Sequence, residues 1–151
     1  MPTLIDYAQE LGKDTLTERP FCPPDSLALT QMVYMPMEGL INGGDTVSVA
    51  AFWAFISKID PDSFVDPYQR KRYFFTDACA QTPRFSGLKL LDYINHIDAV
   101  AETQFCAATF ILPDDSRYIA FRGTDLTLVG WKEDMKMSYM TVPAQQEAVD
   151  Y

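Results

Sequence analysis

The stretch that most constrains this chain is a pair of apolar segments that ends in the run Phe-Arg-Gly-Thr-Asp at residues 121–125. The first segment spans residues 105–112, the second spans 118–121, and a Pro-Asp-Asp-Ser turn at 113–116 joins them. Two apolar, β-rich segments joined by a short turn predict a β-hairpin. Gly123 allows a sharp turn where the chain leaves the sheet, and backbone N–H groups can gather there around an anionic group.

The part of the chain before this hairpin is predicted to be mostly helical. Thr3 can cap the first helix and Gly12 can stop it, while Asp45 or Thr46 can cap the third. Residues 88–97 alternate imperfectly between apolar and polar side chains and are predicted to form the first strand. The predicted helices span residues 3–11, 25–35, 47–59 and 66–80.

The order of these elements predicts the α/β fold class. Three strands in succession with short links indicate an antiparallel start to a sheet, and the preceding helices would cover one face or form a cap. Residues 128–140 are predicted to form a helix or a lid-like segment, and Pro143 opens a further helix. That helix has no C-cap before Tyr151, so we expect a truncated helical segment there. We therefore divide the chain into a mainly helical region, 1–87, and the start of an incomplete α/β core, 88–151.

The hairpin and the segment after it resemble a known family. Phe-Arg-Gly-Thr after an apolar strand, with a Trp and an Asp soon after, is similar to the Phe-Arg-Gly-Ser/Thr segment of class 3, fungal-type lipases. The sequence more closely resembles the Mbeg-like α/β-hydrolases, a bacterial group of unknown function related to those lipases. The stretches that carry this resemblance are 4–7, 20–21, 25–36, 119–125, 128–134 and 142–148.

The resemblance implies the N-terminal part of an α/β-hydrolase, lipase-like fold. Such an enzyme needs a serine nucleophile, a histidine, an acid and donors for the oxyanion. Family members carry a Gly-His-Ser-Lys-Gly-Gly nucleophile elbow shortly beyond the point where this sequence stops, and no Gly-x-Ser-x-Gly occurs within it. His96, the only histidine, precedes the hairpin and is expected to be exposed or structurally satisfied. We therefore expect no catalytic triad residue in this chain.

Thr124 and Asp125 are the candidate oxyanion-hole residues. The resemblance to the lipases places Thr124 where a backbone N–H, and sometimes a hydroxyl, points at the tetrahedral oxyanion, with Asp125 beside it. A donor fixed at the end of a strand needs no reorganisation when negative charge develops. The alternative is that these residues form a turn that caps the next helix, because Thr and Asp are favoured caps. Spacing alone does not separate the two, and the resemblance favours the oxyanion loop.

Four further residues are expected to support this loop. Arg122 ends an apolar strand, so we expect a partly buried guanidinium that pairs with Asp134 or Glu133 and fixes the angle between strand and helix. Gly123 provides the turn. Trp131 is expected to be a core aromatic, with an acyl pocket or a lid as the alternative.

Composition excludes several classes of function. A net charge of −9 argues against nucleic acid and anionic membranes as partners, and the sequence indicates no membrane span. Cys22, Cys79 and Cys106 stand at wide spacings, which predicts free thiols rather than disulfides or a zinc site. Asp6 and Glu10 near the amino terminus are untypical of a signal peptide, so we expect a cytoplasmic protein. No cofactor or metal site is predicted.

Two functional interpretations follow. The first is the N-terminal portion of a lipase-like serine hydrolase for an ester or lipid-like substrate, inactive alone because the nucleophile is absent. The second is a non-catalytic, truncated hydrolase fold that acts as an interaction or assembly module. In the first, the strand that leads into Arg122 would leave one sheet edge and one face uncovered. We therefore expect self-association through that edge, or poor order from about residue 126 onward.

Overall fold

A computed structural model of the chain describes residues 3–41, 44–98, 100, 103–123 and 128–151. The amino-terminal elements are α1 (Leu4–Leu11), α2 (Pro23–Met32), β1 (Val47–Ser48), α3 (Val49–Ile56), the 3-10 helix η1 (Pro61–Ser63) and α4 (Pro67–Ala80). They are followed by β2 (Lys89–Asp98), β3 (Thr103–Ile111), β4 (Arg117–Phe121), α5 (Leu128–Met137) and α6 (Pro143–Asp150).

The four described strands form one antiparallel sheet in the order β1-β2-β3-β4. The predicted α/β class and the antiparallel succession of β2, β3 and β4 are therefore confirmed. The sequence did not predict β1, whose two residues pair with Lys89 and Leu90 of β2. Strand β4 is the last of the four described strands and pairs with β3.

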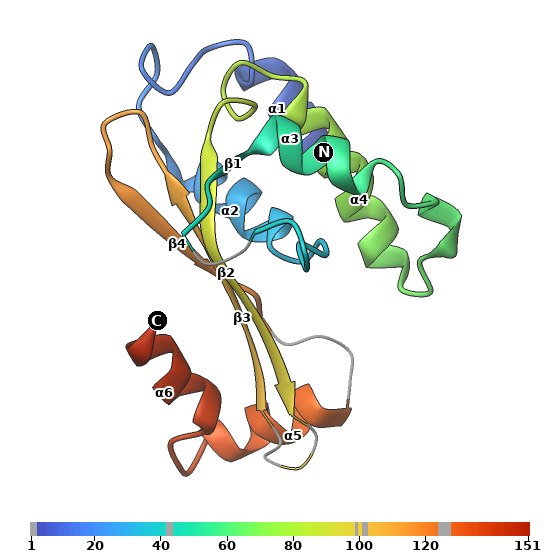
Figure 1. Cartoon of the computed structure of the whole chain (residues 1–151), viewed down its shortest axis with the longest axis vertical. Helices are drawn as coiled ribbons and strands as arrows, with labels where there is room; N and C mark the ends of the chain where they lie inside the picture. Colours follow the sequence, from blue (N-terminus) through green and yellow to red (C-terminus); the bar gives the residue numbers. More distant parts are fainter. Residues whose placement is uncertain (1–2, 42–43, 99, 101–102, 124–127) are drawn as a thin grey trace.

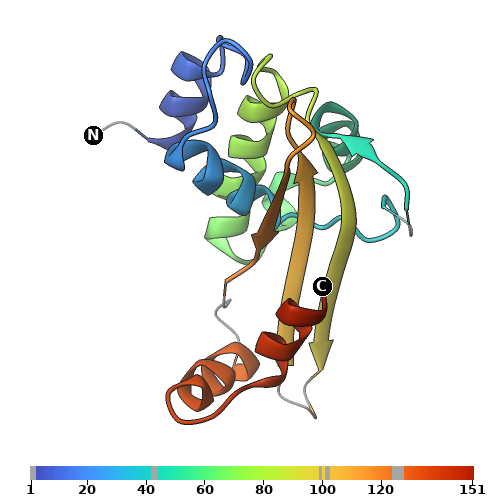
Figure 2. The ribbon, with the colours of Figure 1, turned by 90° about the vertical axis from the view of Figure 1, so that its left-hand side faces the viewer.

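Helices cover the sheet at two places. Helices α1 to α4 gather against one end, whereas α5 and α6 lie at the opposite end of the long β2–β3 hairpin (Figures 1 and 2). The side chains of β3 are buried from residue 103 to residue 110 without alternation, so both faces of this strand are covered. The core on the side of α1 to α4 contains Leu29, Met32, Phe52, Phe85, Leu90 and Phe110.

Local capping accounts for where three of the helices begin. Thr3 Oγ1 accepts from the backbone N–H of Asp6 at 3.2 Å, and Asp6 Oδ2 accepts from the N–H of Thr3 at 2.6 Å. This reciprocal capping box confirms the predicted start of α1. Asp66 caps α4, at the start of the helix that the sequence predicted over 66–80. The predicted cap of α3 is wrong: Ser48 caps it, because Val47–Ser48 extends as β1 before the helix starts.

A β-bulge in β2 changes which side chains face the helices. Leu90 pairs with Phe110, but Asn95 pairs with Cys106, so β2 advances by one residue more than β3. The irregularity includes Asp92, whose φ is 53°. Because successive side chains of a strand alternate between faces, the extra residue brings Asn95 to the face that Leu90 occupies. That face is the one packed against α1 to α4.

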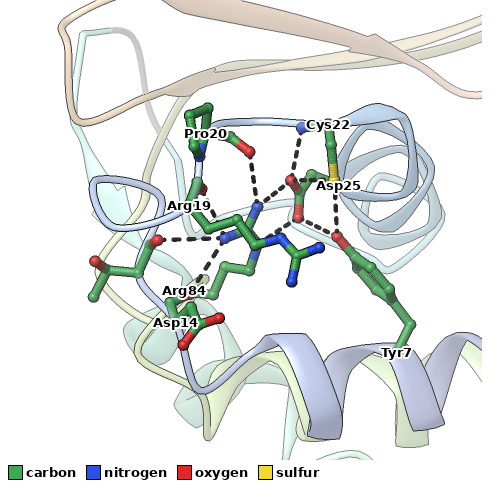
Figure 3. A network of polar contacts seen from close by, with 8 residues as sticks. Tyr7, Asp14, Arg19, Pro20, Cys22, Asp25 and Arg84 are labelled. Atoms are coloured by element: carbon green, nitrogen blue, oxygen red, sulfur yellow. Dashed lines mark hydrogen bonds and ion pairs between the residues drawn. The ribbon is translucent and has the colours of Figure 1, made fainter.

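A buried ion pair joins the segments around α1, α2 and the loop after α4 (Figure 3). Arg84 donates to Asp25 from Nε at 2.7 Å and from Nη2 at 2.5 Å, and both side chains are fully buried. Tyr7 Oη also donates to Asp25, at 2.8 Å, and so do the backbone N–H and the thiol of Cys22. The remaining N–H groups of Arg84 donate to the carbonyls of Asp14, Thr15, Arg19 and Pro20.

Burial opposes the charged form of Asp25, but the hydrogen bonds from Arg84, Tyr7 and Cys22 outweigh it and hold the pKa of this carboxyl below its usual range. The same hydrogen bond to Asp25 raises the pKa of Arg84. Both groups are therefore ionised and mutually neutralised. Helix α2 is fixed at its amino end by this pair, and in its middle the hydroxyls of Ser26 and Thr30 hydrogen-bond to Tyr118 of β4.

The three cysteines are free thiols, with Cys79 and Cys106 buried and Cys22 partly buried. The prediction of free thiols is therefore confirmed. Among the described residues, no helix combines the length and the apolar character needed to cross a membrane.

Candidate functional site

The candidate site lies where the chain leaves β4. Phe121 is the last residue of the strand, and the N–H of Arg122 still donates to the carbonyl of Cys106 at 2.8 Å. The sheet therefore holds the backbone one residue beyond β4. Gly123 follows and is exposed, and α5 begins at Leu128. The candidate oxyanion residues Thr124 and Asp125 lie outside the described residues.

Three side chains form a row across the sheet at this point. Asn95 of β2 pairs with Cys106 of β3, and the Arg122 backbone is bonded to Cys106 from the other side. Arg122 stands two residues after the buried Ala120, so it faces the helices as Asn95 does. Two strand spacings separate Asn95 and Arg122, roughly 10 Å of backbone. The long arginine side chain reaches across β3, where the residue between them is Cys106, to Asn95.

The guanidinium of Arg122 bonds to an amide across the sheet. Nη2 donates to Asn95 Oδ1 at 2.9 Å, and Nε is buried without a hydrogen-bond partner among the described residues. Arg122 thus has an oxygen acceptor within reach, as a structural role requires. The pairing predicted with Asp134 or Glu133 stays a prediction: Asp134 is exposed on α5, and the Glu133 side chain is outside the described part of the chain.

Glu38, from the loop after α2, extends this row outward. Its Oε1 accepts from Asn95 Nδ2 at 2.5 Å and from Tyr93 Oη at 3.0 Å. Burial opposes the ionised form, but hydrogen bonds from Asn95 and Tyr93 and the positive charge of Arg122 hold the pKa of Glu38 below its usual range. Burial raises the pKa of the Tyr93 phenol, so Tyr93 stays neutral and donates.

Gly123 is in close contact with the helical layer. A Cβ at this position would lie 3.0 Å from Tyr34 Oη, the hydroxyl of a half-buried side chain just beyond α2. The ring of Tyr34 is held by the Arg72 guanidinium, 3.8 Å from the ring centroid. Gly123 does not have a positive φ, so the approach of Tyr34 is the structural reason for glycine here. The sharp turn that the sequence suggested involves the residues after Gly123 and stays a prediction.

The remaining predicted residues lie apart from this row. Trp131 of α5 is 54% exposed, so the prediction of a core aromatic is wrong for the chain as described. His96 is exposed on β2, and its Nδ1 lies 3.0 Å from both carboxylate oxygens of Glu147 on α6. The expected exposed or satisfied role of His96 is confirmed. His96 neighbours Asn95 in sequence but points to the opposite face of β2.

Sequence reasoning missed Tyr34, Glu38, Tyr93 and Asn95. Tyr34 was predicted to lie in the helix over 25–35, but α2 ends at Met32, so Tyr34 and Glu38 both belong to the loop around Pro36. Tyr93 and Asn95 stand two residues apart on a strand, so they share a face. The bulge decides that this face is the one that meets the helices. The one available signal was the cation Arg122 at the end of an apolar strand, which indicated that an acceptor had to be near.

Comparison with protein-family models matches residues 79–151 to the family described as Mbeg1-like. No curated protein and no solved structure matches the chain. The matched segment starts at the end of α4 and contains β2, β3, β4 and both carboxyl-terminal helices, together with Asn95, Cys106 and Arg122. From residue 79 onward, the chain therefore carries the sequence pattern of the Mbeg1-like family.

Proposed function

We propose that this chain is the N-terminal portion of a lipase-like serine hydrolase for an ester or lipid-like substrate. Its contribution is the segment after β4, with the backbone N–H groups of Thr124 and Asp125 as oxyanion donors. The observation that carries this proposal is the anchored exit from β4: Arg122 is tied to Cys106 and Asn95, and a helix starts at Leu128. A short loop between a fixed strand end and a helix can hold N–H donors in place before charge develops.

The nucleophile and the histidine would come from sequence after Tyr151. The sequence given contains no nucleophile elbow, and its one histidine is occupied with Glu147 on an exposed surface. This chain alone is therefore expected to be inactive. Its part in catalysis is electrostatic, and removal of one oxyanion donor typically lowers kcat by about 100-fold to 1,000-fold.

A fluorophosphonate probe tests this proposal. The 151-residue chain should remain unlabelled, whereas a protein translated from a reading frame that continues past Tyr151 should be labelled at one serine. In that longer protein, Thr124→Pro removes the backbone N–H and should lower the labelling rate by about 100-fold or more. Thr124→Ala keeps the N–H and serves as the control for the loss of the side chain. Absence of any labelled serine in the longer protein would refute the hydrolase assignment.

A second function, a non-catalytic interaction module, is favoured by the exposed apolar side chains of the carboxyl-terminal helices. Met135 of α5, Tyr139 between the two helices and Val149 of α6 are each more than 70% exposed, and Trp131 of α5 is 54% exposed. Large exposed apolar patches commonly mark interfaces. A stop codon after Tyr151 would favour this function.

Light scattering coupled to size-exclusion chromatography tests the module. Met135→Lys should reduce concentration-dependent association of the chain, whereas Val65→Lys should not, although Val65 is 99% exposed in the loop before α4. A chain that is monomeric at every concentration would argue against the module.

A further inference from the structure

We propose that Glu38 acts as a positioning residue for the exit from β4, through the side-chain amide of Asn95. The proposed relay runs from the Glu38 carboxylate to the Asn95 amide and then to the Arg122 guanidinium. This inference rests on the proposed function only for the oxyanion-binding role of the residues after Gly123. The relay itself is a property of the described residues.

The chemistry of the three groups gives the relay one orientation. An ionised carboxylate only accepts hydrogen bonds, and a guanidinium only donates them. The amide between them must therefore turn its NH₂ group toward Glu38 and its oxygen toward Arg122. The distances agree: 2.5 Å from Asn95 Nδ2 to Glu38 Oε1, and 2.9 Å from Arg122 Nη2 to Asn95 Oδ1.

The surroundings of Glu38 favour its ionised form. The titratable and charged groups that face it are Tyr93 on β2, Cys106 on β3 and Arg122 beyond β4. Tyr93 is a neutral donor, and burial raises the pKa of the Cys106 thiol, so it too is neutral. Arg122 is thus the one cation in this set, and its positive charge also favours the ionised form of Glu38.

Position rather than stability is the expected consequence. Glu38 is an exposed residue of the loop between α2 and β1, far in sequence from the strand end that it influences. Arg122 is attached to Cys106 through its backbone, and its side chain is held at Asn95. With both points fixed, the backbone leaves β4 in a defined direction as far as Gly123. Without Glu38 the Asn95 amide loses the acceptor that fixes its NH₂ group, so only its bond to Arg122 orients it.

Nitrogen–proton correlation spectra of the 151-residue chain test this relay. The Arg122 Nε–H and Gly123 amide signals should shift together as the pH falls through the ionisation of Glu38. Glu38→Gln should abolish that shift, and Asn95→Ala should abolish it while Glu38 still titrates. Asp114→Asn is the matched control: it removes another carboxyl of lowered pKa, in the turn at the opposite end of β4, and should leave the shift intact.

A double variant separates a relay from two independent contacts. Glu38→Gln should move the Arg122 and Gly123 signals in the wild-type background and produce no further movement in the Asn95→Ala background. An unchanged pH-dependent shift in Glu38→Gln, or equal effects of Glu38→Gln in both backgrounds, would overturn the proposal. This measurement needs no turnover, so its result does not depend on fluorophosphonate labelling. Failure of the relay and failure of the hydrolase assignment can therefore be told apart.

Discussion

Replacement of Arg84 by Met is expected to be among the most destabilising single changes in this chain. Asp25 would lose two of its five hydrogen bonds and its counter-charge while remaining buried. Four backbone carbonyls would also lose the donor that now serves them. Removal of one partner from a buried pair typically costs about 3–5 kcal/mol. Since single domains are stable by about 5–15 kcal/mol, the variant should lose about a fifth or more of its unfolding free energy.

Urea unfolding near neutral pH, followed by circular dichroism and by tryptophan fluorescence, measures this loss. Arg70→Met is the matched control, because Arg70 pairs with Asp62 at 3.0 Å on the surface and should cost less than about 1 kcal/mol. The double variant Asp25→Leu with Arg84→Met should be less destabilised than the sum of the two single changes. Loss of less than about 1 kcal/mol in Arg84→Met would refute the reasoning.

The buried pair of Asp25 and Arg84 also makes the free energy of unfolding fall in acid. The folded-state pKa of Asp25 lies below its unfolded value of about 3.9. Its contribution to stability is therefore fully present above that unfolded value and is lost as the pH falls through the folded-state pKa. Arg84→Met removes a main cause of the depressed pKa, so its stability should fall less steeply with acid than that of the wild type.

Three smaller changes test other contacts. Gly123→Ala should be better tolerated when Tyr34→Phe removes the hydroxyl that a Cβ would meet at 3.0 Å, with a coupling of about 0.5 kcal/mol or more in urea unfolding. Cys106→Leu should cost about 1–3 kcal/mol by overpacking a site that is 1% exposed, and nitrogen–proton spectra should show the Arg122 Nε–H signal displaced. Thr3→Ala removes the cap of α1 and should cost about 1 kcal/mol, measured by urea unfolding.

Each of these has an outcome that would contradict it. Equal effects of Gly123→Ala with and without the Tyr34 hydroxyl would mean that the two do not touch. An unmoved Arg122 signal in Cys106→Leu would place the guanidinium away from the thiol. Thr15→Ala is the control for Thr3→Ala, because Thr15 makes the same pattern of bonds with Glu18 outside any regular helix. An equal loss in both would show that the effect is not one of helix capping.

The sequence predicts those parts of this fold that depend on neighbours along the chain. Asp66 before Pro67 identified the start of α4, and Thr3 with Gly12 identified both ends of α1, because caps involve residues three or four positions apart. The turn at 113–116 and the strands around it were predicted for the same reason.

Long-range partners were not predictable in this way. Arg84 stands in a loop with no periodic pattern, yet it is fully buried against Asp25, 59 residues away. The first turn of α2 explained an acidic residue at position 25 without requiring any partner. At the candidate site, the position of Arg122 was predicted, but its acceptor Asn95 depends on strand register. Residues 47–48 likewise extend as β1 because β2 is available to pair with them.

Because of the bulge at Asp92, the candidate site depends on the number of residues in β2, although Asp92 is not itself part of the site. Deletion of Asp92 would restore regular alternation, so every side chain from Tyr93 to Asp98 would exchange faces. Ile94 and His96 would then be directed into the helical layer, while the acceptor of Arg122 would turn outward. Tyr151 Oη, which now donates to the carbonyl of Asp92 at 2.7 Å, would lose the acceptor that ties the end of α6 to the sheet. A change of one codon's length could thus dismantle the arrangement while every residue of the site remains in the sequence.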